Sequence, residues 1–374
     1  MIKDKTDPIR LTFESAKKIV EKKRKWSRTG YQCNPCDPLL PLKHPNTFIE
    51  GKIPNREDES QIGYLIAQIL EYIQQPDSKD LLFLKGPKGS GKSIFAQIFE
   101  QYSQLIGLTS TFQNGYEILA KQVDQFNLKE DLIFLDNAIY LQNTLKSILN
   151  SNLSSNSPKI IAIMDSTEFE IYRRHCLQTG DRSYQSFFSM PIYTEFDITD
   201  ILTKRLVMCS NEHVIPPKLL NITKEIANVS FGNPGIAIGL LDEILNFPGN
   251  LDDLYLSFGI NLKALEDFSS SKTQILREIL IREIENKFLP PNEQNYIIHK
   301  ELTNVLNKTK STITHHLSDL LNSNLIYLEQ STIRDQREKA YRPKDSIFGI
   351  LEYLVFESSA VDAHITLDGT YHER

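Results

Sequence analysis

Gly86-Pro87-Lys88-Gly89-Ser90-Gly91-Lys92-Ser93, entered from the apolar run Leu81-Leu82-Phe83-Leu84, is the stretch of sequence that decides the fold. Its three glycines let the backbone turn with several N–H groups pointing inward, where they can cradle phosphate oxygens. Lys92 can reach the terminal phosphate, and the Ser93 hydroxyl can supply an oxygen ligand to Mg²⁺. The helix expected after the loop directs its positive N-terminal end at the same anion. The stretch therefore predicts a nucleoside triphosphate site that includes every residue from Gly86 to Ser93.

A second motif, Leu132-Ile133-Phe134-Leu135-Asp136, is typical of a parallel strand buried on both faces and ending in a carboxylate. Asp136 is expected beside Ser93, where the two side chains would hold the magnesium ion of bound ATP. Asn137 follows directly. Its amide can orient a water molecule but cannot accept a proton from it, so any ATP hydrolysis is expected to be slow.

Composition places the chain among ordinary globular proteins. It has 374 residues, of which 40% are hydrophobic and 24% charged, enough for two or three domains with their own cores. No apolar run approaches the eighteen or so residues of a membrane span, and the N-terminal residues lack the core of a signal peptide. We therefore expect a cytoplasmic protein without membrane segments.

The cysteines are few, and we expect reduced thiols and not a disulfide framework. Cys33-Asn34-Pro35-Cys36 has the spacing of half a zinc site, but Cys176 and Cys209 stand alone in the sequence. Zinc binding is therefore the less favoured interpretation, behind a proline-rich strap with incidental thiols.

Alternating strands and helices after the phosphate loop predict an α/β fold with a parallel sheet covered on both faces. The expected strands are Thr109 to Phe112, Leu132 to Asp136, Lys159 to Asp165 and Phe187 to Thr194. From about residue 197 only helical patterns remain, namely 198–207, 217–229 and 234–245, which we interpret as a helical lid. The expected domains are an N-terminal basic and proline-rich extension at 1–50, a P-loop nucleotide-binding domain at 51–196, the lid at 197–258, a winged-helix domain at 270–358 and a tail at 359–374.

The N-terminal extension carries a cluster of six lysines and arginines between Lys17 and Lys25, before Trp26. Such charge runs are usually solvated helix faces, although contact with nucleic acid or a partner protein remains an alternative.

The C-terminal third predicts a helix-turn-helix followed by a β-ribbon wing. Helices are expected at 273–287, 300–306 and 311–322, and two strands at 325–328 and 340–343. The second helix of the motif presents short polar donors of the kind that reach base edges and phosphates in a major groove. The candidate DNA-binding residues are Lys308, Lys310, Ser311, Thr312, Thr314 and His315 on this helix and its turn, and Arg334, Arg337, Lys339 and Arg342 in the wing.

Charge distribution supports this assignment only in part. The whole chain has a net charge of −6, which by itself argues against nucleic acid. Between Lys300 and Lys344, eight basic residues face five acidic ones, a local net charge of +3. Basic charge is thus concentrated in the predicted winged helix, which favours duplex DNA as its partner over a protein-docking role.

Together these motifs resemble the AAA+ ATPases of the origin-recognition and replication-initiator group, of the archaeal kind. The resemblance covers about residues 50 to 345, through the segments already quoted and three more. Ile53-Pro54-Asn55-Arg56-Glu57 is similar to the motif that this family packs near adenine, which implies nucleotide contacts from Pro54, Asn55 and Arg56. Ile161-Ala162-Ile163-Met164-Asp165 resembles the strand that ends in a polar sensor of the terminal phosphate, usually an asparagine where Asp165 stands. Ile192-Tyr193-Thr194-Glu195-Phe196, with Ile201, Leu202 and Arg205, resembles the entry into the lid.

The sequence also departs from the family pattern. Asn137 stands where many such ATPases have a glutamate, and Gly235 where an initiator lid offers an arginine to the nucleotide. Arg182 is the best candidate for an arginine finger reaching a neighbouring subunit's triphosphate, with Arg173, Arg174 or a plain surface salt bridge as alternatives. A further helix at 346–356 resembles the dimerisation helix of a transcription regulator.

The expected function is therefore that of an ATP-controlled DNA-binding protein of the replication-initiator kind, with Lys92, Asp136, Asn137, Asp165 and Arg182 as its catalytic residues. Weak ATPase activity and association with itself or with partner AAA+ subunits are expected alongside. An ATP-sensing transcription regulator, a transposition-type ATPase and an assembly adaptor are the alternatives.

Overall fold

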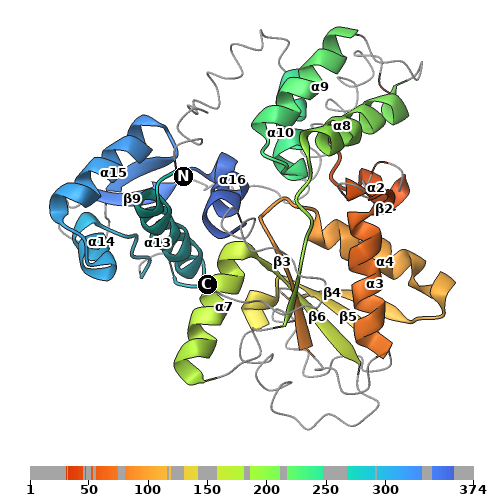
Figure 1. Ribbon diagram of the computed structural model, residues 1–374, viewed down its shortest axis with the longest axis horizontal. Coiled ribbons are helices and arrows are strands. Elements are labelled where there is room, and N and C mark those ends of the chain that lie inside the picture. Colours follow the sequence, from red (N-terminus) through yellow and green to blue (C-terminus); the bar gives the residue numbers. More distant parts are fainter. Residues whose placement is uncertain are drawn as a thin grey trace, which may run out of the picture.

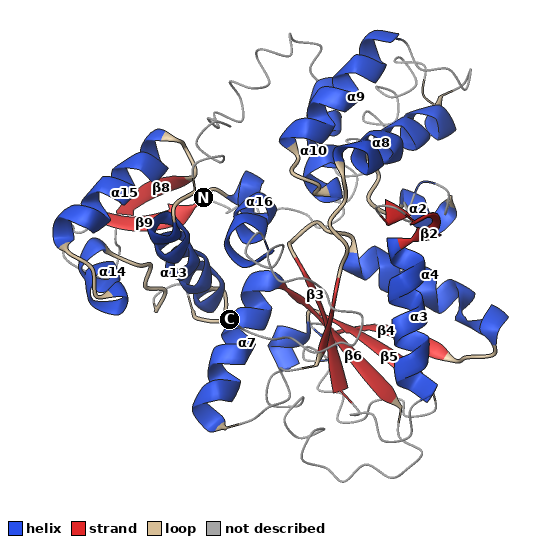
Figure 2. Ribbon diagram, viewed as in Figure 1, coloured by secondary structure: helices blue, strands red, loops and turns tan. Residues whose placement is uncertain are grey.

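The computed structural model describes residues 31, 33–44, 47, 52–53, 56–74, 81–115, 118, 130–141, 158–180, 186–210, 217–246, 268–290, 293–330 and 339–357. These residues form a sheet with helices on both faces, a group of three helices above it, and a separate helical unit with a small hairpin (Figures 1 and 2). We call these parts the sheet unit, the lid and the winged unit.

The sheet unit is built on five parallel strands in the order β4-β5-β6-β3-β7. Counted from β3, which precedes the glycine-rich loop, the order is 2-3-4-1-5, so the α/β fold with a parallel sheet is confirmed. The strands are β3 (Leu81–Gly86), β4 (Ser110–Asn114), β5 (Leu132–Asp136), β6 (Lys159–Asp165) and β7 (Phe187–Ser189). In register, Gly86 lies beside Asp165, and Asn114 lies beside Asp136. The polar residues that end these strands are thus gathered at one edge of the sheet.

The central strands are mostly apolar because helices cover both of their faces. Leu82, Leu84 and Phe134 pack on one face against α3 (Gln61–Gln74) and α4 (Lys92–Ser103). Phe83 and Leu135 point to the other face, against α7 (Ser166–Thr179) and the short 3₁₀ helix η3 (Ala138–Leu141). A second 3₁₀ turn, η2 (Gln104–Ile106), extends α4, and the hairpin of β1 (Lys52–Ile53) and β2 (Arg56–Ser60) precedes α3.

The last strand is shorter than expected. We predicted a strand over Phe187 to Thr194, but β7 ends at Ser189. Residues 190–194 then run as an irregular segment to the lid, where the Thr194 hydroxyl caps helix α8 by accepting a hydrogen bond from the backbone N–H of Asp197. The capping residue of a helix lies just outside it and has an extended backbone. Residues 190–194 therefore belong to neither β7 nor α8.

The lid consists of α8 (Glu195–Cys209), α9 (Pro217–Val229) and α10 (Pro234–Asn246). Its apolar core also contains residues from the N-terminal extension, among them Tyr31, Cys36 and Leu40. Leu40 begins the one-turn helix α2 (Leu40–Lys43), and Tyr31 forms an isolated antiparallel bridge with Ser210. We call residues 31–47 the strap, because described residues of this segment pack into the apolar core of the lid.

The strap overturns the expectation that all cysteines are reduced and that Cys209 stands alone. Cys33 and Cys209 are joined as a disulfide, although they are 176 residues apart in sequence. The pair could not be predicted from the spacing of the cysteines in the sequence, because only the packing of the strap against the end of α8 brings the two residues together.

The winged unit comprises α13 (Ser270–Asn286), α14 (His299–Leu306), α15 (Lys310–Asn322) and the hairpin of β8 (Ile326–Gln330) with β9 (Lys339–Pro343). This is the predicted helix-turn-helix with its wing. The chain continues through η5 (Asp345–Ile347), α16 (Phe348–Glu352) and the π-helical turn η6 (Tyr353–Glu357), and α16 lies between the winged unit and the lid (Figure 1).

The helix predicted at 346–356 forms, but not as a free dimerisation helix. Phe348, Ile350 and Leu351 are almost fully buried and belong to the core of the winged unit. The described part of this segment therefore packs within its own chain.

Within the described residues, every helix is too short or too polar to span a lipid bilayer.

Candidate nucleotide site and winged unit

The glycine-rich loop connects β3 to α4, as the sequence predicts. Gly89 and Gly91 have φ angles of 86° and 95°, a left-handed conformation that side chains other than glycine rarely adopt. Gly91 is also the N-cap of α4, so the unpaired N–H groups of the first helical turn face the loop. The loop therefore has the shape and polarity of a phosphate-binding site.

Lys92 is buried and fully engaged. Its Nζ donates hydrogen bonds to the carbonyl oxygens of Gly86 at 2.8 Å and Pro87 at 2.9 Å, and forms an ion pair with Asp165 Oδ1 at 2.8 Å. Asp165 ends β6, so the register of the sheet places it beside the loop. A triphosphate at this loop has to compete with Asp165 for the ammonium group.

Asp136 and Ser93 come together as expected. The Asp136 carboxylate accepts hydrogen bonds from the Ser93 hydroxyl and from the backbone N–H of Asn137. Burial raises the pKa of Asp136, while these two hydrogen bonds and the charge of Lys92 act in the opposite direction. A hydroxyl and a carboxylate in contact are the oxygen donors that Mg²⁺ prefers, so the pair fits a magnesium ion bound with a nucleotide.

Asn137 lies at the same strand end with a left-handed backbone, φ 52°. Its Nδ2 is 3.4 Å from the side-chain oxygen of Asn114 on β4. The amide is thus held at the edge of the site, as a residue that could orient water would be.

A cavity of about 350 Å³ opens beside the loop. It contains Lys92, Ser93, Asp136, Asn137 and Asp165, and is therefore lined by four of the five residues expected to be catalytic. The sequence analysis placed Tyr193, Ile201, Arg205 and Gly235 in the lid or its entry, but it did not identify the strap part of the outer wall. This wall is formed by the strap and lid residues Pro38, Pro41, Thr47, Tyr193, Ile201, Arg205, Pro234, Gly235 and Ile238.

The outer wall supplies an apolar surface for a nucleotide base. Among the described residues of this outer wall, Arg205 is the one with a basic side chain, and it is 3% exposed. Burial lowers the pKa of Arg205 to about 10, against the opposing charges of Cys36 and Asp37. Apart from the spacing of Cys33 and Cys36, the strap residues carry no motif, so only their proline content could have indicated a packed segment.

The lid contacts the loop directly through the start of α10. The backbone N–H of Gly235 donates to the carbonyl oxygen of Gly89 at 2.9 Å, and Asn233 Nδ2 donates to the carbonyl oxygen of Lys88 at 2.7 Å. A Cβ atom at position 235 would lie 2.7 Å from the Cα of Gly89. This close approach explains why a glycine, and not an arginine, occupies position 235.

The segment after the wing reaches the same loop. The Glu352 carboxylate is completely buried and accepts hydrogen bonds from the backbone N–H groups of Lys88 at 2.6 Å and Thr167 at 3.0 Å. Gly349, on the same helix, lies against the carbonyl oxygen of Lys88, where a Cβ atom would overlap it. The peptide groups of Lys88 are therefore held by the lid on one side and by the winged unit on the other.

Three carboxyl groups meet near Lys92. Burial and the neighbouring Asp165 raise the pKa of Glu168 to about 8 and that of Glu352 to about 7. Glu168 Oε2 accepts the backbone N–H of Asp165 at 2.9 Å and lines the cavity. Neither glutamate was identified from the sequence, because each becomes part of the site only through tertiary packing.

The interface between α7 and α13 accounts for two arginine-finger candidates. Arg174 forms an ion pair with Glu278 of α13 at 2.7 Å, and Arg173 pairs with Glu170 at 2.8 Å. Glu170 also accepts a short hydrogen bond from Arg277 of α13. Arg173 and Arg174 thus have partners within the chain, while Arg182 lies outside the described residues.

The motif at residues 53–57, which the resemblance places near adenine, is described only in part. Arg56 begins β2, but its side chain lies outside the described residues, as do Pro54 and Asn55.

The helix-turn-helix has the expected geometry. Asn307 adopts a left-handed conformation, φ 49°, in the turn, and the Thr309 hydroxyl caps α15 by accepting the N–H of Thr312. Ile313 and Leu317 are buried in the core of the winged unit. The opposite face of α15 exposes Lys310, Ser311, Thr314 and His315, with Lys308 and Thr312 half-buried.

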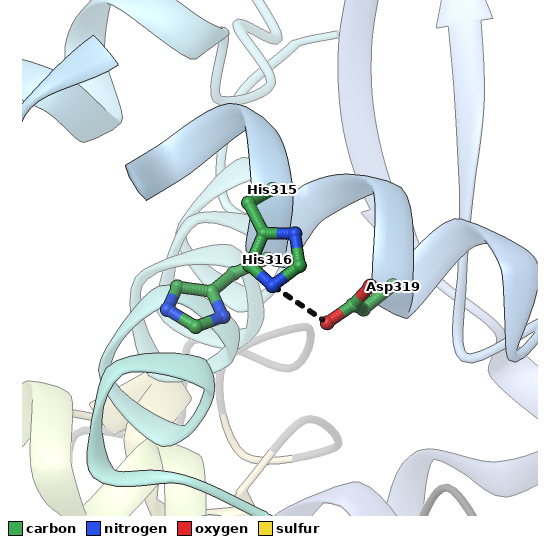
Figure 3. A group of neighbouring side chains, drawn as sticks. All are labelled: His315, His316 and Asp319. Atoms are coloured by element: carbon green, nitrogen blue, oxygen red, sulfur yellow. Dashed lines mark ion pairs between the residues drawn. The ribbon is translucent and has the colours of Figure 1, made fainter. Parts of the chain in front are cut away.

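Several of these polar groups have partners. Lys308 Nζ donates to the Ser271 hydroxyl at 3.0 Å, and the Thr314 hydroxyl lies 2.9 Å from the ring nitrogen Nε2 of His299. Figure 3 shows His315, His316 and Asp319 on α15, with Asp319 directed toward the ring of His315. Asp319 also lies 3.3 Å from Lys272 Nζ, so a cation already neutralises this group.

The wing residues separate into two kinds. Arg342 is held inside the unit, with two hydrogen bonds to Glu283 of α13, one to Glu329 of β8 and its guanidinium over the ring of Tyr296. We therefore remove Arg342 from the DNA-facing set and assign it a structural role. Lys339 is exposed on β9, and Arg334 and Arg337 lie outside the described residues.

Comparison with known proteins yields likenesses of structure only. No protein-family model matches the chain, and no curated protein matches it. The structure of Aeropyrum pernix ORC1 in complex with DNA is similar with a TM-score of 0.41 and 16% identity, over 87% of this chain and 97% of that one. Aeropyrum pernix ORC2, in ADPNP–ADP complexes, gives 0.39 and 16%, over 82% and 95%. AMPPCP-bound DnaA from Aquifex aeolicus gives 0.38 and 13%, over 80% and 95%. The sheet order, the helical lid and the C-terminal helix-turn-helix with a wing together give the architecture that the sequence predicts: an α/β domain with a parallel sheet, followed by a helical lid and a winged helix.

Proposed function

We propose that this protein binds ATP with Mg²⁺ between the sheet unit and the lid, and that the bound nucleotide controls how the winged unit contacts duplex DNA. Within this class we favour a replication-initiator-like role, because the motif resemblance is strongest in the ATPase part. Self-association or association with partner AAA+ subunits belongs to the same proposal.

The observation that carries the proposal is the double contact at Lys88. Its carbonyl oxygen accepts from Asn233 of the lid, and its N–H donates to Glu352 behind the wing. A phosphate bound at this loop adds negative charge beside the Glu352 carboxylate, and like charges in a buried site repel strongly. Nucleotide occupancy can therefore weaken the docking of the winged unit and change its freedom to contact DNA.

Lys92 and Asp165 give the switch a second component. Lys92 is paired with Asp165 in the structure and would pair with the terminal phosphate when ATP binds. Release of Asp165 leaves its carboxylate close to Glu168 and Glu352, which adds to the repulsion. A coupling of about 1 to 3 kcal/mol between the two sites would change DNA affinity by roughly 5- to 150-fold.

Hydrolysis is proposed to be slow and to reset the switch. Asn137 can position water but cannot take its proton, and Asp136 accepts the Ser93 hydroxyl and would help to hold a bound metal ion. Contact with DNA is assigned to Lys308, Lys310, Ser311, Thr312, Thr314 and His315 with the wing residues Lys339, Arg334 and Arg337. Lys310 and Lys339, which are exposed in the structure, are the clearest candidates.

A salt titration of duplex DNA binding, with and without ATP–Mg²⁺, tests the proposal. We expect affinity to fall steeply with salt, to change with ATP in the wild type, and to be insensitive to ATP in Lys92→Ala. Lys224→Ala, on an exposed position of α9, is the matched control and should behave as the wild type. Lys310→Ala should weaken binding to all sequences and reduce the salt slope by about one.

Other outcomes separate the alternatives. Flat salt dependence together with binding of a protein partner would favour an assembly adaptor and reject DNA binding. DNA-stimulated turnover that disappears in Lys92→Ala would identify an active ATPase, whereas ATP-dependent affinity with negligible turnover would identify a nucleotide sensor.

A further inference from the structure

The strap is joined to the lid by a covalent bond. The disulfide between Cys33 and Cys209 links the start of the strap to the last residue of α8, and beside it Tyr31 forms an antiparallel bridge with Ser210. The two half-cystines differ in exposure, because Cys209 is fully buried whereas Cys33 is only partly buried. A thiol in solution therefore approaches this bond from the side of Cys33.

The same strap forms part of the wall of the nucleotide cavity. Pro38, Pro41 and Thr47 line the cavity from the strap, together with Ile201 of α8. These strap residues follow Cys33 closely in the sequence, so the disulfide fixes the point from which this part of the wall begins. A strap that is released at Cys33 leaves the wall without its covalent anchor.

Arg205 connects the strap to the interior of the cavity. Its guanidinium lines the cavity and donates hydrogen bonds to the carbonyl oxygens of Pro35 at 3.2 Å and Asp37 at 2.9 Å, both of them in the strap. Arg205 is almost completely buried, so these acceptors and the charge of Asp37 offset part of the cost of burying its own charge. When the strap leaves, Arg205 exchanges these partners for water. The polar lining of the cavity then changes together with its apolar wall.

We propose that the disulfide between Cys33 and Cys209 is a redox switch of the nucleotide cavity. In the oxidised protein it holds the strap closed, as in the structure, and in the reduced protein the strap opens and nucleotide binds more weakly. The inference rests on the proposed function, because it takes this cavity as the site of ATP.

The reductant that the switch requires is a dithiol. One thiolate of the dithiol attacks the Cys33 sulfur, the S–S bond breaks, and Cys209 leaves as a thiolate that takes up a proton. The second thiol of the reductant then displaces Cys33 from the mixed disulfide. Two electrons and two protons pass to the protein, and the reductant becomes a cyclic disulfide.

The size of the effect follows from the population of the closed strap. An apparent dissociation constant equals the intrinsic one divided by the fraction of molecules that are competent to bind. In the reduced protein, the closed form depends on the hydrogen bonds of Arg205, the bridge of Tyr31 and apolar contacts such as those of Leu40. We expect the reduced strap to be closed in roughly a tenth to a third of the molecules, which weakens ATP binding by about three- to tenfold.

Titration of the full-length protein with a fluorescent ATP analogue and Mg²⁺ tests the switch. One sample is oxidised with oxidised glutathione, the other is reduced with dithiothreitol, and both are desalted before use. Thiol counts under denaturing conditions verify the two states, since two of the four cysteines are in the disulfide. The oxidised sample should contain two thiols and bind the analogue about three- to tenfold more tightly than the reduced sample, which should contain four.

Substitutions of the cysteines separate the switch from a general effect of the reductant. Cys33→Ser and Cys209→Ser, each alone, should bind the analogue as the reduced wild type does and should not respond to dithiothreitol. Cys176→Ser is the matched control, because Cys176 lies in α7 and packs in a different apolar cluster from the strap, and it should keep the full response.

Trypsin cleavage after Lys43 reports the strap itself and needs no nucleotide. Lys43 is exposed and ends α2, so cleavage there requires this turn to unfold, and it should be several-fold faster in the reduced protein. Equal cleavage rates, or equal affinities for the ATP analogue in samples with two and four thiols, would overturn the switch and leave ATP binding intact. Four thiols in the oxidised sample would overturn it as well. A lack of binding in both states would instead reject the proposed function, and with it the assignment of the switch to ATP.

Discussion

At the scale of single residues, the two glycines of α10 differ in the space that is free for a side chain. A Cβ atom at Gly235 would lie 2.7 Å from the Cα of Gly89, whereas a Cβ atom at Gly239 would meet no atom within 4 Å. Gly235→Ala should therefore lower the free energy of unfolding by about 1 to 3 kcal/mol and weaken ATP binding, because the lid has to move off the loop. Gly239→Ala should be neutral or stabilising by up to about 1 kcal/mol. Chemical denaturation and nucleotide titration of both variants test this, and equal effects would contradict the lid contact.

Glu352 makes the stability of the protein depend on pH in a defined direction. Its pKa is raised from 4.5 to about 7 by burial, so folding favours the protonated form. The contribution of this group is complete below about pH 4.5 and is lost as the pH rises through about 7. Glutamine stays neutral throughout, so Glu352→Gln should gain stability relative to the wild type between pH 5 and pH 8, by roughly 1 to 3 kcal/mol.

Denaturation curves of the wild type and Glu352→Gln at several pH values measure this difference. Glu168, with a pKa of about 8, is present in both proteins, so it changes the stability of both with pH in the same direction. Two stability profiles that run parallel from pH 5 to pH 8 would mean that Glu352 is not buried against the loop.

At the scale of secondary structure, Arg342 and Lys339 on strand β9 are expected to have different roles, one in stability and the other in DNA binding. Arg342 connects β9 to Glu283 of α13 with hydrogen bonds of 2.6 and 3.0 Å, and Glu283 is buried. Removing one partner of a buried ion pair leaves the other uncompensated, so Arg342→Ala should cost about 3 to 5 kcal/mol of stability. Lys339→Ala should leave the melting temperature unchanged and weaken DNA binding. Thermal unfolding and DNA titration of the two variants separate a structural from a DNA-facing role, and a stable Arg342→Ala protein with reduced DNA affinity would reverse our assignment.

Elements could be predicted from the sequence wherever local pattern and tertiary environment agree. The strands at Leu132–Asp136 and Lys159–Asp165 were predicted with their observed bounds, because a strand buried on both faces has a continuous apolar run between its ends. The loop, Ser93 and Asp136 could also be predicted, since their chemistry requires those residue types at that spacing. The strap wall of the cavity, the cysteine pair and Glu352 could not be predicted, because each depends on contacts between segments more than a hundred residues apart in sequence.

At the scale of the whole molecule, the winged unit is docked on the sheet unit through several contacts. Glu352 contacts the loop, Glu357 contacts Ser166 and Lys85, and Arg174 of α7 meets Glu278 of α13 in an ion-pair interface. A rigid interface of this kind is required if a change at the nucleotide is to alter the orientation of α15, the helix that we propose contacts DNA. Coupling should therefore depend on Glu278 even though this residue touches neither the loop nor the exposed face of α15.

Glu278→Ala should retain ATP binding and DNA binding, each measured alone, but lose at least half of the ATP-dependent change in DNA affinity. Glu285→Ala is the comparison variant and should have the smaller effect, because Glu285 lies two turns along the same helix and forms its ion pair with Arg282 across 3.4 Å on a more exposed surface, although the charge of Arg174 also acts on it. Linkage makes the test reciprocal, since DNA should change ATP affinity by the same factor in the wild type and by a smaller factor in Glu278→Ala. If both glutamate variants keep the full coupling in both directions, the α7–α13 interface carries no signal, and the contacts of Glu352 and Glu357 with the sheet unit have to transmit it.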